Sequence, residues 1–110
     1  MRHSRYERFI NGCGLPITES VGGELALTKA DALKAVEILA DCQIGILGGD
    51  VYELESDGYL RPTYDSWYCE KSGLTSPEFV DLSVKKAIQY LSSYKESTDI
   101  KTRYTLVIDI

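Results

Sequence analysis

The sequence predicts an α+β fold, with a mainly antiparallel sheet packed with two to three helices. Two segments repeat apolar residues at the three- and four-residue spacing of amphipathic helices, and two others have the composition or the alternation of strands. The predicted order is helix, helix, a run of strands, helix, strand, and amphipathic helices need a sheet face to cover their apolar stripes. A chain of 110 residues has room for one core, so residues 1–110 are expected to form a single domain.

The first helix is predicted from about Arg5 to Asn11. Ser4 and Glu7 have the spacing of a capping box, and a glycine at position 12 or 14 can end the helix. The next residues, GLPITESVGGELAL, mix Gly, Pro and Thr with isolated apolar side chains. They predict a loop, with a short strand as the alternative.

Two further helices are predicted. One runs from about Lys29 to Asp41, where Thr28 with Asp31 resembles an N-terminal cap. The other opens at Ser76-Pro77-Glu78, because serine can cap, proline is tolerated in the first turn and an early acid suits the helix dipole. The predicted apolar faces are Ala32, Leu33, Val36, Leu39 and Ala40 on the first, and Val80, Val84, Ala87, Ile88 and Leu91 on the second, which Tyr94 could extend.

The strands are predicted in two places. The segment QIGILGGDVYELESDGYLRPTYDSWYCEK is rich in Ile, Val and Tyr; Gly48-Gly49 predicts a bulge or kink, and Ser56-Asp57-Gly58 predicts a hairpin turn. The final RYTLVIDI alternates like a strand with one buried face. Tyr104, Leu106 and Ile108 make up that face, and the apolar end at Ile110 favours a C-terminus paired into the sheet.

The cysteines and the single histidine argue against a metal or cofactor site. Cys13, Cys42 and Cys69 are odd in number, widely spaced and without a C-x-x-C pair, which disfavours a disulfide framework and a zinc site. They are expected to be reduced, buried small hydrophobes. His3 lies near a chain end, where any catalytic arrangement would depend on a poorly held base. We therefore expect no cofactor, no metal and no catalysis.

The composition is that of a globular protein with no membrane partner. No apolar run approaches the roughly 20 residues that span a bilayer, and the N-terminal residues contain no apolar signal region. We therefore expect a cytoplasmic protein.

The excess negative charge lies in one segment. Residues 50–70 contain six acids and one base, Arg61, whereas the rest of the chain has eleven residues of each sign. The acids are Asp50, Glu53, Glu55, Asp57, Asp65 and Glu70, and the aromatic residues among them are Tyr52, Tyr59, Tyr64, Trp67 and Tyr68. Large aromatics beside concentrated charge favour a docking face for a basic partner. The alternative is the solvated face of a hairpin whose aromatics are buried.

Individual residues of this segment suggest different roles. Trp67 is expected to be a structural core residue, and Tyr64 or Tyr68 is the better interface candidate. Strand alternation divides the acids between two faces if no bulge intervenes. One face would hold Asp50, Tyr52 and Leu54, and the other Val51, Glu53 and Glu55.

Other chemistry fits the segment less well. The glycines at 45, 48 and 49 lack the phosphate-loop pattern, and the acids lack the ligand spacing of an EF-hand. The negative charge has the wrong sign for nucleic acid. Nearby carboxylates such as Glu53 with Glu55 could act as acid and base, so a small carboxylate-dependent hydrolase is a further, weaker alternative.

Two of the segment's motifs resemble the immunity protein 40 family of bacterial polymorphic toxin systems. The motifs are Gly48-Gly49-Asp50-Val51-Tyr52-Glu53 and Tyr64-Asp65-Ser66-Trp67-Tyr68-Cys69-Glu70, and the resemblance covers the chain from about Ile44 onward. It implies a small cytoplasmic α+β protein that binds and neutralises one cognate toxin domain without catalysis. It also implies contact-dependent growth inhibition or a related delivery system, and toxins that are often nucleases.

The hypothesis that follows is stoichiometric occlusion of a basic toxin domain through the acidic, aromatic face. Its candidate toxin-binding residues are Asp50, Tyr52, Glu53, Glu55, Asp57, Tyr64, Asp65, Tyr68 and Glu70. The alternative partner is another basic protein, to which the chain would bind as an adaptor or regulatory subunit.

Overall fold

The computed structural model describes residues 4–17 and 24–110, and in this part of the chain it confirms the α+β prediction. His3 lies outside the described residues. A three-stranded antiparallel sheet has the order β4-β3-β5, and a two-stranded ribbon pairs β1 with β2. The elements are α1 Ser4–Cys13, β1 Leu15–Pro16, β2 Leu25–Ala26, α2 Lys29–Asp41, β3 Ile46–Leu54, β4 Leu60–Tyr68, α3 Ser76–Ser93 and β5 Lys101–Ile108.

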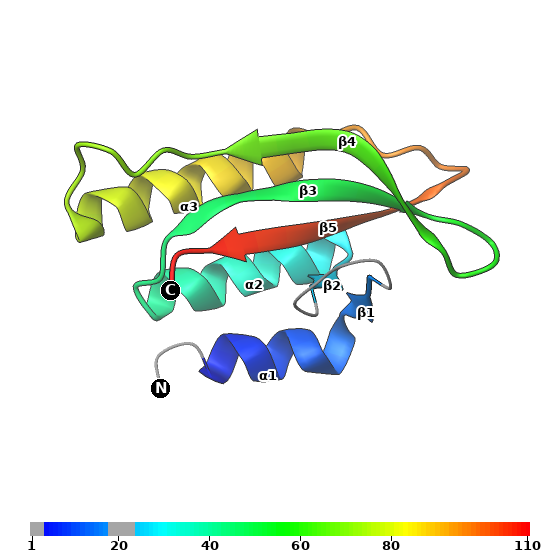
Figure 1. Ribbon diagram of the computed structural model, residues 1–110, viewed down its shortest axis with the longest axis horizontal. Coiled ribbons are helices and arrows are strands. Elements are labelled where there is room, and N and C mark those ends of the chain that lie inside the picture. Colours follow the sequence, from blue (N-terminus) through cyan, green and yellow to red (C-terminus); the bar gives the residue numbers. More distant parts are fainter. Residues whose placement is uncertain (1–3, 18–23) are drawn as a thin grey trace.

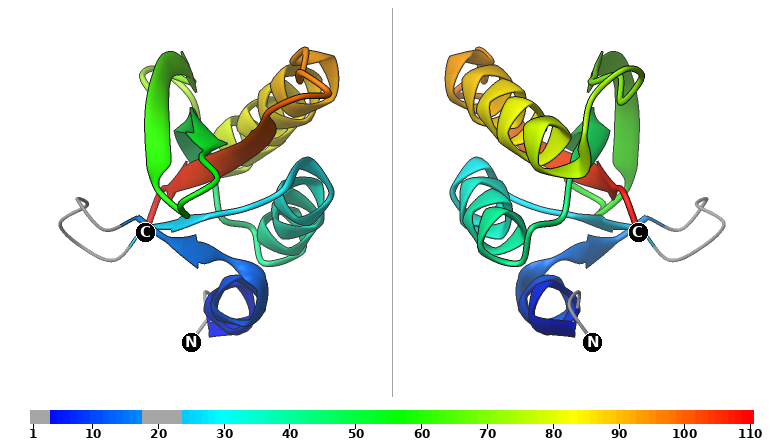
Figure 2. Two further views of the ribbon diagram at one scale, coloured as in Figure 1. Left: turned by 90° about the vertical axis from the view of Figure 1, so that its right-hand side faces the viewer. Right: turned by 90° about the vertical axis from the view of Figure 1, so that its left-hand side faces the viewer.

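The three-stranded sheet has helices on one face (Figures 1 and 2). α2 and α3 lie side by side against this face, and α1 packs on α2. The ribbon joins the sheet at the β5 edge, where Leu27 and Tyr104 exchange two backbone hydrogen bonds. No described helix covers the opposite face, which we call the open face. By strand register, the open face carries Asp50, Tyr52, Ser66, Tyr68 and Val107.

The core lies between the sheet and the two covering helices. One hydrophobic cluster of described residues draws on elements from α1 to β5. Its sheet residues include Val51, Trp67 and Tyr104, which face the helices, while Val36 and Leu39 come from α2. Burial of these side chains is the main force that holds the layers together.

The helix predicted from Lys29 to Asp41 is confirmed with those bounds. Thr28 Oγ1 accepts a hydrogen bond from the Asp31 N–H at 3.1 Å, as the cap predicts. The helix ends where Gln43 takes a positive φ of 57° and the Ile44 N–H bonds to the Leu39 carbonyl at 2.9 Å.

The third helix confirms its predicted position but corrects two details. Its N-cap is Thr75 and not Ser76, because Thr75 and Glu78 form a reciprocal capping box. Ile88 was predicted to be buried but is 41% exposed. Phe79 and Ser83 are buried instead, so the helix is rotated relative to the predicted stripe.

Two contacts fix that rotation of α3. A Cβ added to Gly45 would lie 2.3 Å from the Phe79 ring, so the glycine lets this ring approach the backbone. Ser83 Oγ accepts a hydrogen bond from the Ile46 N–H at 2.9 Å and donates one to the Val80 carbonyl at 3.2 Å. A buried polar side chain with both bonds made is stable in this position.

The remaining predictions are mostly confirmed. α1 exists but is longer than predicted, and the ribbon of β1 and β2 is the short-strand alternative. In β5, Tyr104 and Leu106 are buried. Ile110, however, is 74% exposed, because the strand ends at Ile108 and Asp109 makes the last backbone bond, to the Gly45 carbonyl.

The prediction that the cysteines are reduced and buried holds only in part. All three cysteines are free; Cys69 is buried, whereas Cys13 and Cys42 are only half-buried. Among the described residues, no helix is long and apolar enough to cross a membrane.

Candidate binding surface on the β3–β4 hairpin

The acidic segment forms the hairpin of β3 and β4, and its acids are spread along the whole hairpin. Glu55 and Asp57 lie in the turn, whereas Glu70 follows the far end of β4. A nine-residue strand is about 30 Å long. The six acids therefore do not meet at one point, although all lie on the same hairpin.

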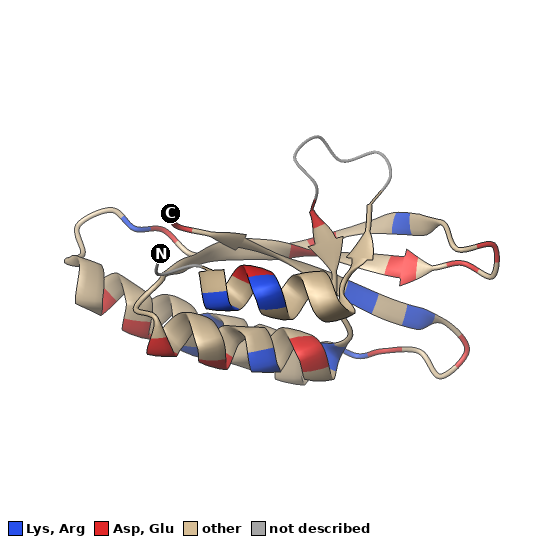
Figure 3. Ribbon diagram, turned by 90° about the horizontal axis from the view of Figure 1, so that it is seen from below, with Lys and Arg blue, Asp and Glu red and all other residues tan. Residues whose placement is uncertain are grey.

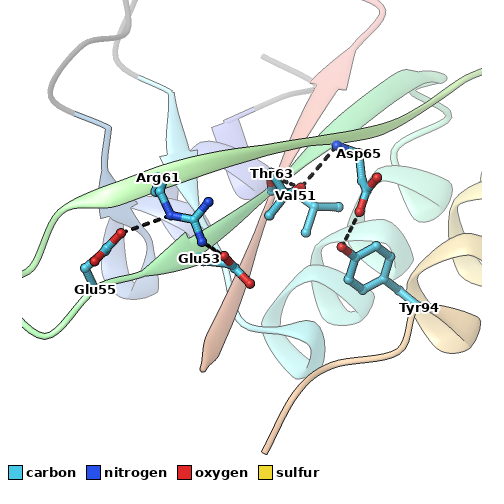
Figure 4. Close-up of polar contacts among 7 residues, drawn as sticks. All are labelled: Val51, Glu53, Glu55, Arg61, Thr63, Asp65 and Tyr94. Carbon is cyan, nitrogen blue, oxygen red and sulfur yellow. Dashed lines mark hydrogen bonds and ion pairs between the residues drawn. The ribbon is translucent and has the colours of Figure 1, made fainter. Parts of the chain in front are cut away.

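Arg61, the one base of the segment, binds two of the acids at the turn end. Its Nη2 is paired with Glu53, and its Nε donates to Glu55 Oε1 at 3.0 Å (Figure 4). Glu53 lies in β3 and Glu55 directly follows the strand, two residues on, so both carboxylates come within reach of one guanidinium. These two carboxylates are consequently committed within the molecule.

Asp57 forms a hydrogen bond within the turn itself. Asp57 Oδ1 accepts a hydrogen bond from the Tyr59 N–H at 3.0 Å, and the Glu55 N–H bonds to the Tyr59 carbonyl at 2.8 Å. Gly58 supplies the positive φ of 89° that the turn needs. Asp57 therefore shapes the turn.

Sheet pairing also brings basic residues beside this end of the hairpin. Lys101 and Arg103 of β5 pair with Leu54 and Tyr52 of β3. In Figure 3, blue segments on the strands lie at the same end of the sheet as the red segments of the hairpin turn. The negative charge at the turn is thus balanced in part by a strand that lies distant in sequence.

A bulge interrupts β4 at its middle. Asp50 pairs with Ser66 and Tyr52 with Pro62, so the single residue between them on β3, Val51, faces the three residues 63–65 of β4. Tyr64 lies in the extra stretch, has a positive φ of 70° and is 90% exposed. The strand predicted from composition is present, but this bulge has no counterpart in the sequence-based prediction.

Thr63 and Asp65 fix the bulge on both sides of Tyr64 (Figure 4). Thr63 Oγ1 donates to the Val51 carbonyl at 2.9 Å and accepts from the Asp65 N–H at 3.1 Å. The Asp65 carboxylate accepts a hydrogen bond of 2.6 Å from the Tyr94 hydroxyl. Burial, followed by this bond to Asp65, raises the pKa of Tyr94.

An aromatic ladder supports β4 from the helix side. The Trp67 ring stacks on Tyr90 with centroids 4.7 Å apart, Tyr90 lies 5.8 Å from Tyr94, and Tyr94 meets Tyr104 edge to face at 5.8 Å. Trp67 is 7% exposed and belongs to the core cluster. Its side chain therefore lies on the face opposite to any partner on the open face.

The open face carries the other candidates. Asp50, Tyr52 and Tyr68 share it, and Tyr68 is 64% exposed. Burial, followed by the charges of Asp50 and Glu24, raises the pKa of Tyr52. In the described part of the chain, neither Asp50 nor Glu70 has an ion pair or side-chain hydrogen bond, so both carboxylates are available to a partner.

A shallow hollow of about 330 Å³ lies on the open face beside these residues. Gly48 and Gly49 form part of its wall, together with Asp50, Tyr68 and Val107. No larger residue fits at either position. A Cβ added to Gly48 would lie 2.2 Å from the Trp67 carbonyl oxygen, and a Cβ added to Gly49 would lie 2.2 Å from the Thr105 carbonyl oxygen. The glycine pair thus permits both close strand packing and the hollow.

Apart from Tyr52, which is half-buried on the open face, the candidates fall into two groups. Asp50, Tyr64, Tyr68 and Glu70 are free for a partner, whereas Glu53, Glu55, Asp57 and Asp65 bond within the hairpin or to α3. Sequence reasoning missed Thr63 and Tyr94, which hold the bulge, and no sequence signal identifies them. Arg61 could have been suspected, as the one base among six acids. Among residues 4–17 and 24–110, no three His, Cys, Asp or Glu side chains come together as metal ligands.

Comparison with known proteins gives one match. The family model described as Immunity protein 40 matches residues 11–108, nearly the whole chain. No curated protein and no solved structure matches. The match extends well to the N-terminal side of the hairpin motifs that carry the resemblance.

Proposed function

This chain belongs to the immunity protein 40 family, and we propose that it neutralises one cognate toxin domain by binding it one-to-one through the β3–β4 hairpin. Membership implies an immunity protein that acts against a toxin. The proposed place of action is the cytoplasm of the cell that makes it, and the proposed mechanism is occlusion without catalysis.

The observation that carries this proposal is the pairing of free acids with exposed rings. Asp50 and Glu70 have no partner among the described side chains, and Tyr64 and Tyr68 expose most of their surface. Exposed tyrosines offer large contact areas at a low cost in side-chain entropy. Unpaired carboxylates beside them attract Lys and Arg of a partner.

We further propose that the toxin is a basic nuclease. A nuclease needs a positively charged cleft to hold its phosphate backbone. Carboxylates of the hairpin would pair with the cationic side chains of that cleft, and tyrosine rings would fill its base pockets. The hairpin would then exclude the nucleic acid from the cleft.

The test compares two double charge reversals. Asp50→Lys/Glu70→Lys changes the hairpin, and Glu37→Lys/Asp81→Lys changes exposed acids of α2 and α3 by the same net charge. Each variant is titrated by calorimetry, at low and high salt, into the polypeptide encoded directly upstream. In parallel, each is tested for protection of cells that express this polypeptide. Reversal at the hairpin should abolish binding and protection, whereas reversal on the helices should leave both intact.

Each other result has a definite meaning. Binding that survives reversal at the hairpin would contradict the electrostatic mechanism and leave immunity standing. A toxic upstream polypeptide that wild-type protein neither binds nor neutralises would contradict the proposed function. A harmless upstream polypeptide that binds tightly would favour the adaptor role.

A further inference from the structure

Tyr64 has an uncommon backbone conformation for a bulky residue. In the described part of the chain, only Gln43 and Tyr64 have a positive φ without being glycine. Gln43 ends α2, where a left-handed residue is an ordinary way to close a helix. Tyr64 lies within a strand, where a side chain in this conformation is strained and glycine would not be.

Packing of the Tyr64 ring does not account for this conformation. The ring is 90% exposed and takes no part in the aromatic ladder beneath β4. The backbone around it is nevertheless held firmly, because Thr63 bonds to Val51 on one side and Asp65 bonds to Tyr94 on the other. The strained conformation thus presents the ring to solvent from a fixed base.

The edge of β4 also disfavours one common mode of docking. A partner strand added along β4 would need a regular row of N–H and C=O groups. The bulge at Tyr64 breaks that row, and Pro62 has no N–H to offer. A partner at this edge must therefore be recognised mainly by side chains.

We propose that Tyr64 is the principal anchor for the toxin and inserts its ring into an apolar slot on the toxin domain. This inference rests on the proposed function. The free carboxylate of Asp50, on the neighbouring strand of the same hairpin, suits a slot whose rim carries Lys or Arg, and a cation on that rim can also lie over the ring face. A ring already held in its binding position loses little freedom on association, which raises affinity.

The test uses variants that separate the ring from the backbone strain. Tyr64→Gly removes both, and Tyr64→Asn removes the ring while keeping a residue that tolerates a positive φ. Tyr64→Phe keeps the ring. Tyr59→Ala is the matched control, because Tyr59 is a partly exposed tyrosine of the same hairpin that is not in the bulge. Dissociation constants are measured by calorimetry against the C-terminal domain of the upstream polypeptide, and melting temperatures are measured on each free variant.

We expect the variants without the ring to bind the toxin domain less tightly although they are at least as stable as the wild type. Tyr64→Gly and Tyr64→Asn should weaken binding by at least about 30-fold, the level of an interface hot spot, with melting temperatures equal to or above that of the wild type. Tyr64→Phe should bind within about tenfold of the wild type, because one hydroxyl bond at an interface is worth less than the ring. Tyr59→Ala should bind like the wild type.

Three results would overturn the inference. Wild-type affinity in both Tyr64→Gly and Tyr64→Asn would remove the anchor role and leave the proposed function intact. Melting temperatures below that of the wild type in both Tyr64→Gly and Tyr64→Asn would show that the ring supports the fold. If the wild-type protein itself does not bind the toxin domain, the proposed function fails and the anchor role fails with it.

Discussion

Tyr94 donates a hydrogen bond of 2.6 Å to the carboxylate of Asp65, and this bond joins the end of α3 to the bulge of β4. The two residues are 29 positions apart in sequence. Tyr94 is also held by its neighbours, since its ring meets Tyr104 edge to face and its carbonyl accepts a bond from Lys29 Nζ at 2.9 Å. The helix layer therefore fixes a surface bulge that it does not cover.

Replacing Tyr94 by Phe should loosen this connection. The variant keeps the ring packing and loses one hydrogen bond to a carboxylate, so the free energy of unfolding should fall by about 1 kcal/mol. Affinity for the toxin domain should fall as well, because the bulge that presents Tyr64 loses a support. Urea denaturation and calorimetry measure the two effects.

Tyr104→Phe is the control for that prediction. Its hydroxyl donates to Glu96 Oε2 at 2.7 Å, so this variant also loses one phenolic bond to a carboxylate, but away from the bulge. It should lose comparable stability and keep its affinity. Equal affinity in both variants would show that the bond between Tyr94 and Asp65 does not control the binding surface.

The sequence correctly predicted the elements that are determined by residues close to one another in the chain. The helix from Lys29 to Asp41 followed from a cap at Thr28 and one apolar face, and both are determined within a few residues. The bulge predicted at Gly48-Gly49 is confirmed by the register shift between Ile46 and Gly48. Here glycine was itself the signal.

Features caused by distant residues could not be predicted. Tyr64 has no glycine beside it, and although Pro62 is compatible with a bulge, the form of this bulge depends on Val51 and Tyr94, which are distant in sequence. The burial of Phe79 depends in the same way on the space that Gly45 leaves. Composition identified the hairpin as the candidate surface, but tertiary contacts divide its acids into free and committed ones.

Gly49→Ala should destabilise the protein strongly. The new Cβ would lie 2.2 Å from the Thr105 carbonyl oxygen and 2.3 Å from the Trp67 ring, both inside the packed sheet. Relief requires strands to move apart, so the free energy of unfolding should fall by more than about 2 kcal/mol.

Gly12→Ala is the contrast: it lies in α1 with nothing within 4 Å of its Cβ, so stability should rise by up to about 1 kcal/mol. Denaturant unfolding of both variants checks the pair, and a mild effect at Gly49 would contradict the close packing of Trp67.

The cap of α3 gives a prediction that separates two neighbouring residues. Thr75→Ala should lower the free energy of unfolding by about 1 kcal/mol, because the Glu78 N–H loses its side-chain acceptor. Ser76→Ala should change it little, since Ser76 is already inside the helix. The bond from the Thr75 N–H to Glu78 Oε1, at 2.9 Å, also lowers the pKa of Glu78. Thermal unfolding at neutral pH distinguishes the two variants, and a larger loss in Ser76→Ala would move the cap to Ser76.

Tyr6 makes the protein's stability sensitive to alkaline pH. Burial in the core, followed by the charge of Glu24, raises the pKa of Tyr6 to about 12 from an ordinary value of 10.0. Above pH 10 the unfolded chain releases this proton and the folded chain does not. The stability that the folded protein gains from keeping Tyr6 protonated is therefore fully present below pH 10 and is lost as the pH rises toward 12. A shift of this size corresponds to a loss of about 2 to 3 kcal/mol across that range.

Tyr6→Phe should remove this part of the alkaline decline. The ring stays in the core, so the variant and the wild type should have similar free energies of unfolding near neutral pH, and the variant should become the relatively more stable protein between pH 10 and 12. Urea denaturation at several pH values measures the difference between the two curves. Parallel curves would contradict a buried Tyr6 hydroxyl, because an exposed phenol ionises at the same pH in the folded and the unfolded chain. The remaining decline in the variant belongs to tyrosines such as Tyr52 and Tyr90, whose pKa values burial also raises.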